Sequence, residues 1–349
     1  MTFACAAMVS LLVSAPPGAG APAHPKGYVC RRAAEPIVVD GKLGDASWAD
    51  APWTDTFVDI EGDKKPKPRF KTRAKMLWDD QYLYIAADME EPHVWGTLTK
   101  HDSVIFQDND FEVFIDPDSD NQNYGELEIN ALNTEWDLFL PKAYRDGGPA
   151  LNSWEIPGLK KGVNVRGTLN DPKDTDEGWS VEMAIPWSVW REHTKQALPP
   201  REGDQWRINF SRVEWHHELV DDKYRKVPNT KEDNWVWSPQ EAVDMHRPET
   251  WGYLQFTGKS GNVPFRPDPT LAARNLLMKI YWAQKPYHGE HKNWAETLKD
   301  LKIELPEGVP APTIRLTKDG YEATIPLAAE IGGPLTISQD SRFGSGIAK

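Results

Sequence analysis

The chain has 349 residues, and its 53 acidic against 40 basic side chains leave a formal charge of −13. This excess of acid disfavours nucleic acid or an anionic membrane surface as a partner, because both would require clusters of Lys and Arg. A hydrophobic content of 39% with 27% charged residues is typical of a folded protein and excludes a wholly disordered one. The 16 tryptophans outnumber the 11 phenylalanines and the 10 tyrosines, which favours large aromatic cores or flat aromatic platforms for a ligand.

The first feature in chain order is an apolar run at residues 3–15, followed by small residues and prolines. The run is shorter than the about 20 residues that a membrane span needs, and it is typical of the apolar part of a signal peptide. We therefore expect residues 1–23 to be a signal peptide and the protein to be exported, to the periplasm or outside the cell. Cleavage would remove Cys5 and leave Cys30 as the single cysteine, so we expect no disulfide and no paired-cysteine metal site.

Short runs of alternating apolar and polar residues follow, bounded by Asp, Gly, Asn and Pro. They lie at residues 74–78, 82–88, 111–116, 126–132, 178–185, 205–213 and 251–256. Many short strands separated by turn residues predict an all-β fold, an antiparallel two-sheet β-sandwich of the jelly-roll type. We expect this sandwich to occupy residues 35–257, with Val113, Ile115, Leu127 and Ile129 in its core.

The remainder of the chain predicts a small C-terminal α+β extension at residues 270–349. It follows a linker at residues 258–269, which are rich in Gly and Pro. Apolar residues from Leu271 onward recur at helical spacing and predict a helix of three turns or more. A second short helix is expected at residues 294–301. Two alternating runs then predict a hairpin, with strands at residues 313–317 and 321–325.

An acidic segment extends from Asp102 to Asp137, with 11 Asp and Glu residues and no Lys or Arg. Within it, Asp116, Asp118 and Asp120 place three carboxylates in one turn, which is a plausible oxygen cage for Ca²⁺. The segment is not an EF-hand, because the glycine that this motif needs at its sixth position is missing. The alternative is a solvated hairpin loop that joins two strands.

The same segment predicts a sheet with one apolar and one acidic face. Glu112 alternates with apolar neighbours on one strand, and Glu128 and Asn130 do so on the next. Carboxylates and an amide on one sheet face suit the hydroxyl groups of a sugar. Paired carboxylates about 5–10 Å apart also hydrolyse glycosidic bonds, so a glycoside hydrolase that uses strand carboxylates remains an alternative.

Six sequence blocks in this part of the chain occur in a characteristic order. They are IVVDGKLGDASW at 37–48, LWDDQYLYIA at 77–86, DFEVFID at 110–116, GWSVEMAIPW at 178–187, RINF at 207–210 and PETWGYLQF at 248–256. Together they resemble carbohydrate-binding module family 9 over about residues 35–257. The resemblance implies a non-catalytic sandwich of the kind that accompanies secreted polysaccharide-degrading enzymes, with structural Ca²⁺ typical of characterised members.

The resemblance also implies a sugar site, with three departures from the family. Sugar-binding members hold a terminal sugar between two Trp rings, and these positions fall on Phe106 and Met245 here. An Arg common in the family is replaced by Glu128. Trp95, Trp235 and Trp237 could supply another aromatic platform for the sugar if they are exposed, and belong to the core if they are buried. The ligand-binding residues that we expect are Phe106, Glu112, Glu128, Asn130, Asn209, Ser211, Met245 and His246.

We therefore expect an exported, non-catalytic protein that binds an oligo- or polysaccharide, associated with polysaccharide or xylan degradation and with a glycoside hydrolase as its partner. No nucleotide cofactor, nucleic acid or membrane span is expected. The second hypothesis is a haem-binding sandwich domain of an oxidoreductase complex, because cytochrome domains share a similar fold. Haem would require Met89 with His93 or His101 as axial ligands.

Overall fold

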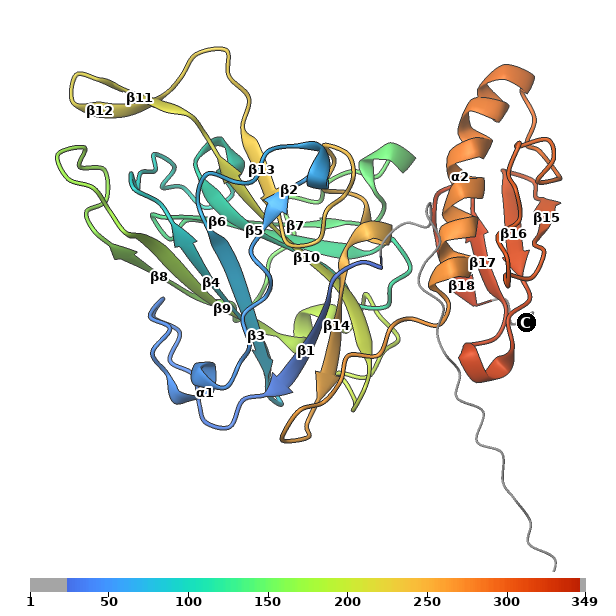
Figure 1. The fold of residues 1–349 in the computed structure, drawn as a ribbon, viewed down its shortest axis with the longest axis horizontal. Coiled ribbons are helices and arrows are strands. Elements are labelled where there is room, and N and C mark those ends of the chain that lie inside the picture. Colours follow the sequence, from blue (N-terminus) through green and yellow to red (C-terminus); the bar gives the residue numbers. More distant parts are fainter. Residues whose placement is uncertain (1–23, 346–349) are drawn as a thin grey trace, which may run out of the picture.

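The structure is a computed structural model that describes residues 24–345, so the predicted signal peptide at residues 1–23 lies outside the described residues. Its strands are β1 (Gly27–Arg32), β2 (Val58–Asp59), β3 (Thr72–Trp78), β4 (Tyr82–Glu90), β5 (Asp110–Asp116), β6 (Tyr124–Asn130), β7 (Glu135–Leu140), β8 (Lys160–Arg166), β9 (Gly178–Pro186), β10 (Gln205–Glu214), β11 (His217–Val220), β12 (Lys223–Lys226), β13 (Asp233–Val236) and β14 (Gly252–Thr257). A short helix, α1 (Ala46–Ala49), precedes β2. All of these strands except the β11–β12 hairpin belong to one curled 12-stranded sheet (Figure 1).

The order of strands in this sheet is β7-β6-β5-β10-β14-β1-β3-β4-β9-β8; off this path, β13 pairs with β10, and β2 pairs with β13. Apolar side chains from β5, β6 and β10 share one hydrophobic core with those of β3, β4 and β9. The two halves of the sheet are therefore the two layers of a β-sandwich, which confirms the predicted all-β fold class. The predicted core residues Val113, Ile115, Leu127 and Ile129 are all at most 2% exposed.

One strand departs from the antiparallel pattern. β1 pairs in parallel with both β14 and β3, and this double pairing joins the two layers into a single sheet. The sheet therefore includes residues that precede the range 35–257 in which we expected the sandwich.

The C-terminal extension consists of a long helix on a small sheet; the helix and the first two strands were predicted from the sequence, whereas the last two strands were not. The helix α2 (Leu271–His291) buries Leu276, Leu277 and Ile280 completely. The sheet is antiparallel, and its strands are β15 (Thr313–Leu316), β16 (Tyr321–Ile325), β17 (Leu335–Ser338) and β18 (Phe343–Ser345). The expected hairpin is confirmed as β15–β16. No helix among the described residues is long and apolar enough to cross a membrane.

The second short helix expected at residues 294–301 is wrong. The segment forms turns, and Lys302 takes a left-handed φ of 56° that ends them. A side chain of α2 holds the segment instead, because Gln284 donates to the carbonyl of Ala295 and accepts its N–H. The turns that follow keep local hydrogen bonds, such as that from the N–H of Ile303 to the carbonyl of Leu298 at 2.9 Å, but these do not continue into a helix.

The C-terminal extension lies beside the sandwich (orange to red in Figure 1) and contacts the loop that follows β5. The N–H of Phe343 donates to the carbonyl of Asp120 at 2.9 Å, and the amide of Asn121 donates to the carbonyl of Ser341 at 3.0 Å. The hydroxyl of Tyr281 donates to Asp146 at 2.6 Å. The acidic loop is therefore part of the contact between the two units.

Candidate functional site

The polar face predicted for the acidic segment exists, and strand register assembles it. Glu112 on β5 lies directly opposite Glu128 on β6 and Ser211 on β10. Trp136 on β7 lies opposite Glu128 on the other side. Side chains that face each other across antiparallel strands are about 4.5–5.5 Å apart at Cβ, so these four residues form one continuous row. The apolar residues that alternate with them along β5, β6 and β10 point to the opposite face, into the core.

A cavity of about 350 Å³ opens on this face. The predicted site residues that line it are Phe106, Glu112, Glu128, Met245 and His246. Sequence reasoning missed several others, namely Phe114, Glu126, Trp136, Tyr144, Glu232 and Asp244. The alternation of side chains along a strand could have predicted Glu126 and Trp136, because Glu126 precedes Glu128 by two residues and Trp136 lies on the adjoining strand. Tyr144 and Asp244 come from loops, where no periodic signal exists.

Three predicted site residues lie outside this lining. Asn130 is fully buried, and its amide donates to the carbonyl of Leu98 and to the carboxylate of Asp108. Asn209 is fully buried as well and exchanges two hydrogen bonds with the backbone of Ser238. Ser211 is fully buried beside Glu112. Both asparagines fasten loops to the sheet, so the structure gives them a supporting role.

An aromatic pair forms one wall of the cavity. Phe106 lies in a short 3-10 helix, and its ring is stacked on that of Trp136 with 6.5 Å between centroids. The backbone N–H of Phe106 donates to Glu128 at 2.8 Å, and its carbonyl accepts from the indole of Trp215 at 2.8 Å. Met245 is only 8% exposed because it packs in a small core beside Trp251. The two positions that carry Trp in the family thus form one aromatic wall and one largely buried edge.

The other candidate platforms are part of the core. Trp95, Trp235 and Trp237 are each at most 3% exposed. Trp95 packs with Trp215, whereas Trp235 and Trp237 belong to the main core of the sandwich. None of the three presents a ring face to a ligand.

The cavity has several carboxyl groups, and the pKa values of those on β5 and β6 are raised above the usual range. Burial raises the pKa of Glu112 to about 7. Burial, together with the charge of Glu112, raises the pKa values of Glu126 and Glu128 well above their usual range. Burial and the nearby guanidinium of Arg145 lower the pKa of His246 to about 4, so this imidazole is neutral at pH 7. No Lys or Arg within residues 24–345 lines the cavity.

The glycosidase alternative requires two carboxylates that face each other across a sugar. Here Glu112 and Glu128 lie side by side on neighbouring strands and form a single floor. This pair therefore does not flank a ligand in the way that a glycosidase requires.

The predicted calcium loop is compact and tied to its own backbone. Asp116 is fully buried and accepts hydrogen bonds from the N–H groups of Ser119 and Asn121, both at 2.9 Å. One oxygen from each of Asp116, Asp118 and Asp120 lies within 4.8 Å of the others. Asp118 Oδ1 is buried without a hydrogen-bond partner among the described residues, and burial together with Asp120 raises the pKa of Asp118 to about 6. Three carboxylates and one unused oxygen fit a hard cation such as Ca²⁺.

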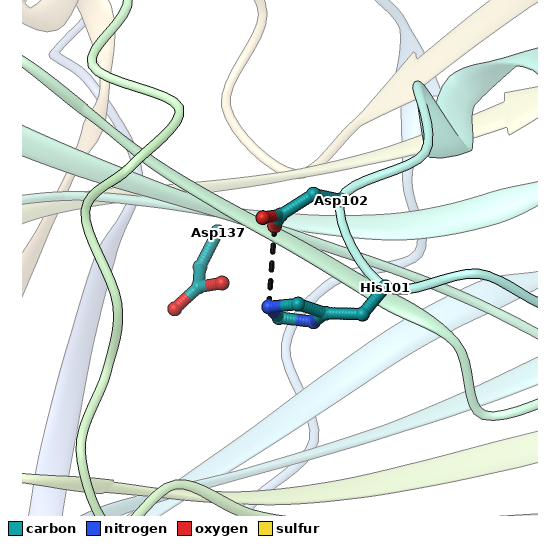
Figure 2. A group of neighbouring side chains, drawn as sticks. All are labelled: His101, Asp102 and Asp137. Carbon is teal, nitrogen blue, oxygen red and sulfur yellow. Dashed lines mark ion pairs between the residues drawn. The ribbon is translucent and has the colours of Figure 1, made fainter.

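A third acidic group contains one histidine (Figure 2). His101 Nε2 lies 3.3 Å from Asp102 and 3.2 Å from Glu155. Burial lowers the pKa of His101, but the hydrogen bond to Glu155 and the surrounding carboxylates raise it overall. Asp137 on β7 faces the same group, and its second oxygen accepts the N–H of Ile156 at 2.6 Å. His101 Nδ1 also lies 3.5 Å from Glu135 on β7, so this group connects the loop that carries Phe106 to the edge strand β7.

The residues that the haem hypothesis would use are engaged elsewhere. Met89 is fully buried in the main core of the sandwich. His93 Nδ1 makes a 3.1 Å hydrogen bond with the hydroxyl of Tyr224, and His101 is surrounded by carboxylates. No feature of the described residues favours haem.

Comparison with known proteins gives matches of three kinds. The sequence profile of the carbohydrate family 9 binding domain-like family matches residues 39–259. Exoglucanase XynX of Acetivibrio thermocellus is 30% identical over 153 residues, which cover 43% of this chain and 12% of that enzyme. Endo-1,4-beta-xylanase A of Thermoanaerobacterium saccharolyticum is 28% identical over 151 residues, which cover 43% of this chain and 11% of that enzyme. The matched region therefore spans about an eighth of the length of these curated relatives.

Among solved structures, a carbohydrate-binding module of family 9 from Caldicellulosiruptor kristjanssonii in complex with cellotriose is similar at 15% identity and a TM-score of 0.44. The match covers 69% of this chain and all of that module. The same module in complex with glucose gives a TM-score of 0.44 at 15% identity, covering 67% of this chain and 98% of that one. Because the family profile spans well over half of the 349 residues, the chain belongs to the carbohydrate family 9 binding domain-like family.

Proposed function

We propose that the cavity over β5, β6 and β7 binds one sugar unit of an oligo- or polysaccharide without reacting with it. The observation that carries this proposal is the combination of a stacked aromatic wall, Phe106 and Trp136, with a floor of carboxylates, Glu112 and Glu128. Aromatic rings pack against the C–H face of a sugar, and carboxylates accept hydrogen bonds from its hydroxyls. Cavities that hold small ligands begin at roughly 300 Å³, so this one suits a single sugar ring.

The biological setting is part of the same proposal. The curated relatives are named as a xylanase and an exoglucanase, which supports a role in the degradation of xylan or a related polysaccharide beside a glycoside hydrolase. The apolar run at residues 3–15 supports export. We further propose that residues 35–257 together with β1 are the binding domain, that residues 258–269 are a linker and that residues 270–349 form an accessory unit docked on the domain.

A glycan array probed with the purified full chain tests the proposal. We expect saturable retention on at least one plant or bacterial polysaccharide. If a correctly folded sample is retained by no glycan on an array that includes xylans, glucans and mannans, the proposal is wrong.

We also propose that Asp116, Asp118 and Asp120 hold a structural Ca²⁺. An ion that binds only the native state stabilises it, so removal of calcium with EDTA should lower the melting temperature of the wild type. The variant Asp118→Asn removes one ligand and should melt at a lower temperature in calcium, with a smaller response to EDTA. Equal responses of the wild type and Asp118→Asn to EDTA would show that this loop binds no calcium.

A further inference from the structure

The floor of the cavity brings the two proposed sugar-contacting carboxylates, Glu112 and Glu128, together with a third, Asp110, more closely than sugar contacts alone require. Asp110 and Glu112 project from the same face of β5, and Glu128 lies opposite Glu112 on β6. One oxygen from each of the three residues lies within 4.8 Å of the other two. The three residues are 0%, 4% and 1% exposed, respectively. Three carboxylates therefore converge on one small, enclosed volume.

These carboxylates have almost no compensation from the protein. Asp110 Oδ1 accepts the N–H of Val213 at 3.2 Å, and Glu128 accepts the N–H of Phe106 at 2.8 Å. Asp110 Oδ2 is fully buried and has no hydrogen-bond partner among the described residues. Within residues 24–345, no Lys, Arg or His makes an ion pair with any of the three. Burial of unpaired carboxylates costs several kcal/mol per ion, so two backbone donors and the hydroxyl of Ser211 beside Glu112 leave most of this cost in place.

We propose that Asp110, Glu112 and Glu128 bind a divalent cation, Ca²⁺ by the chemistry of its ligands, at the floor of the cavity. All the donor atoms are carboxylate oxygens, without the nitrogen or sulfur that would favour zinc or copper. Ca²⁺ takes 6–8 oxygen ligands, more than these three side chains fill from one side. Glu112 and Glu128 line the cavity, whereas Asp110, two residues before Glu112 on β5, is outside its lining, so we expect the open coordination positions to face the cavity.

This ion site deepens the proposed function. The claim that the ion takes part in sugar binding rests on that function, whereas the ion site itself does not. An ion with free positions at the floor of the cavity can be ligated by two neighbouring hydroxyls of the bound sugar. Sugar binding then requires the ion. The site is separate from the loop at Asp116, because four residues of extended strand put Glu112 and Asp116 about 13 Å apart.

Terbium luminescence tests the ion site without reference to sugar. Tb³⁺ replaces Ca²⁺ at oxygen sites and emits when a nearby indole is excited, and Trp136 lies opposite Glu128. For the full chain we expect saturable emission that Ca²⁺ competes away. Glu128→Gln and Asp110→Asn should each weaken this binding at least tenfold, and Trp136→Phe should reduce the emission. The matched control Asp118→Asn alters the other loop and should retain the signal that depends on Trp136.

Two variants, Glu128→Gln and Asp110→Asn, are used so that the test still gives an answer if one of them fails to fold. Circular dichroism shows whether each variant is folded. If folded Glu128→Gln or Asp110→Asn binds Tb³⁺ as the wild type does, the ion site does not exist. If the site binds Tb³⁺ but no glycan binds the protein, the ion site stands and the proposed sugar function fails.

The dependence of sugar binding on the ion is measured with a glycan retained on the array. We expect EDTA to weaken its binding at least tenfold in both the wild type and Asp118→Asn, and Ca²⁺ to restore it. Unchanged glycan affinity in EDTA would overturn the requirement for the ion while leaving sugar binding intact. Retention of amino sugars alone, insensitive to EDTA, would also overturn it, because the ligand's ammonium would then supply the positive charge.

Discussion

Replacement of Arg212 by methionine is expected to lower the free energy of unfolding by about 3–5 kcal/mol, because it leaves two buried carboxylates without their cation. Arg212 is 1% exposed, and its guanidinium donates to Glu91 at 2.8 Å and to Glu214 at 2.9 Å. It also donates to the hydroxyl of Thr72 and to the carbonyl of Glu90, which belong to the opposite layer of the sandwich. Urea denaturation at pH 7 measures the loss.

The control for Arg212→Met removes the charges of its partners as well. In the triple variant Arg212→Met, Glu91→Gln, Glu214→Gln, no unpaired ion remains, and we expect most of the stability to return. A loss of under about 1 kcal/mol for Arg212→Met alone would show that the buried ion pairs do not hold the two layers together.

Substitution of Glu112 by glutamine is expected to stabilise the calcium-free protein, with an effect that depends on pH. Burial raises the pKa of Glu112 to about 7 in the folded protein from an ordinary value of 4.5. Below pH 4.5 the carboxyl is protonated in both the folded and the unfolded chain, so it contributes no pH-dependent difference. Between pH 4.5 and about 7 the unfolded chain is ionised while the folded protein is still protonated, so the wild type loses stability over this range. Above pH 7 the loss is complete and amounts to about 3 kcal/mol of stability, which the glutamine variant retains.

Denaturation in EDTA at pH 5 and at pH 8 measures this effect for the wild type and Glu112→Gln. The difference between the two proteins should be larger at pH 8. Glu296→Gln, which alters an exposed carboxylate of the C-terminal extension, serves as the matched control and should show no comparable pH dependence. If Glu112→Gln is no more stable than the wild type at pH 8, Glu112 does not carry the uncompensated charge that its burial indicates.

Period-two alternation was sufficient to predict the sandwich and the two faces of its acidic hairpin. It placed Val113 and Leu127 in the core and Glu112 and Glu128 together on the opposite face, and the register of β5 and β6 agrees. Alternation does not predict which loops cover a face of the sheet. Asn130 has the parity of Glu128, yet the loop held by Asp108 closes over it.

Features that depend on non-local contacts escaped prediction from the sequence. The parallel pairing of β1 requires residues from three distant parts of the chain, β1, β3 and β14. The ion pairs of Arg212 join two layers whose mutual position no local pattern reveals. Residues 294–301 have helical apolar spacing, but a contact with Gln284 decides their conformation.

The central claim is that the cavity over β5, β6 and β7 is the sugar site, and a calorimetric titration tests it most directly. The titrant is an oligosaccharide of the glycan retained on the array, and the samples are the wild type, Trp136→Ala and Trp282→Ala. Trp136 forms the aromatic wall of the cavity, whereas Trp282 is 37% exposed on α2 and outside the cavity. Loss of one aromatic contact of up to about 1.5 kcal/mol corresponds to roughly tenfold in affinity. We predict a loss of about this size for Trp136→Ala and none for Trp282→Ala; wild-type affinity in a folded Trp136→Ala variant would contradict the account.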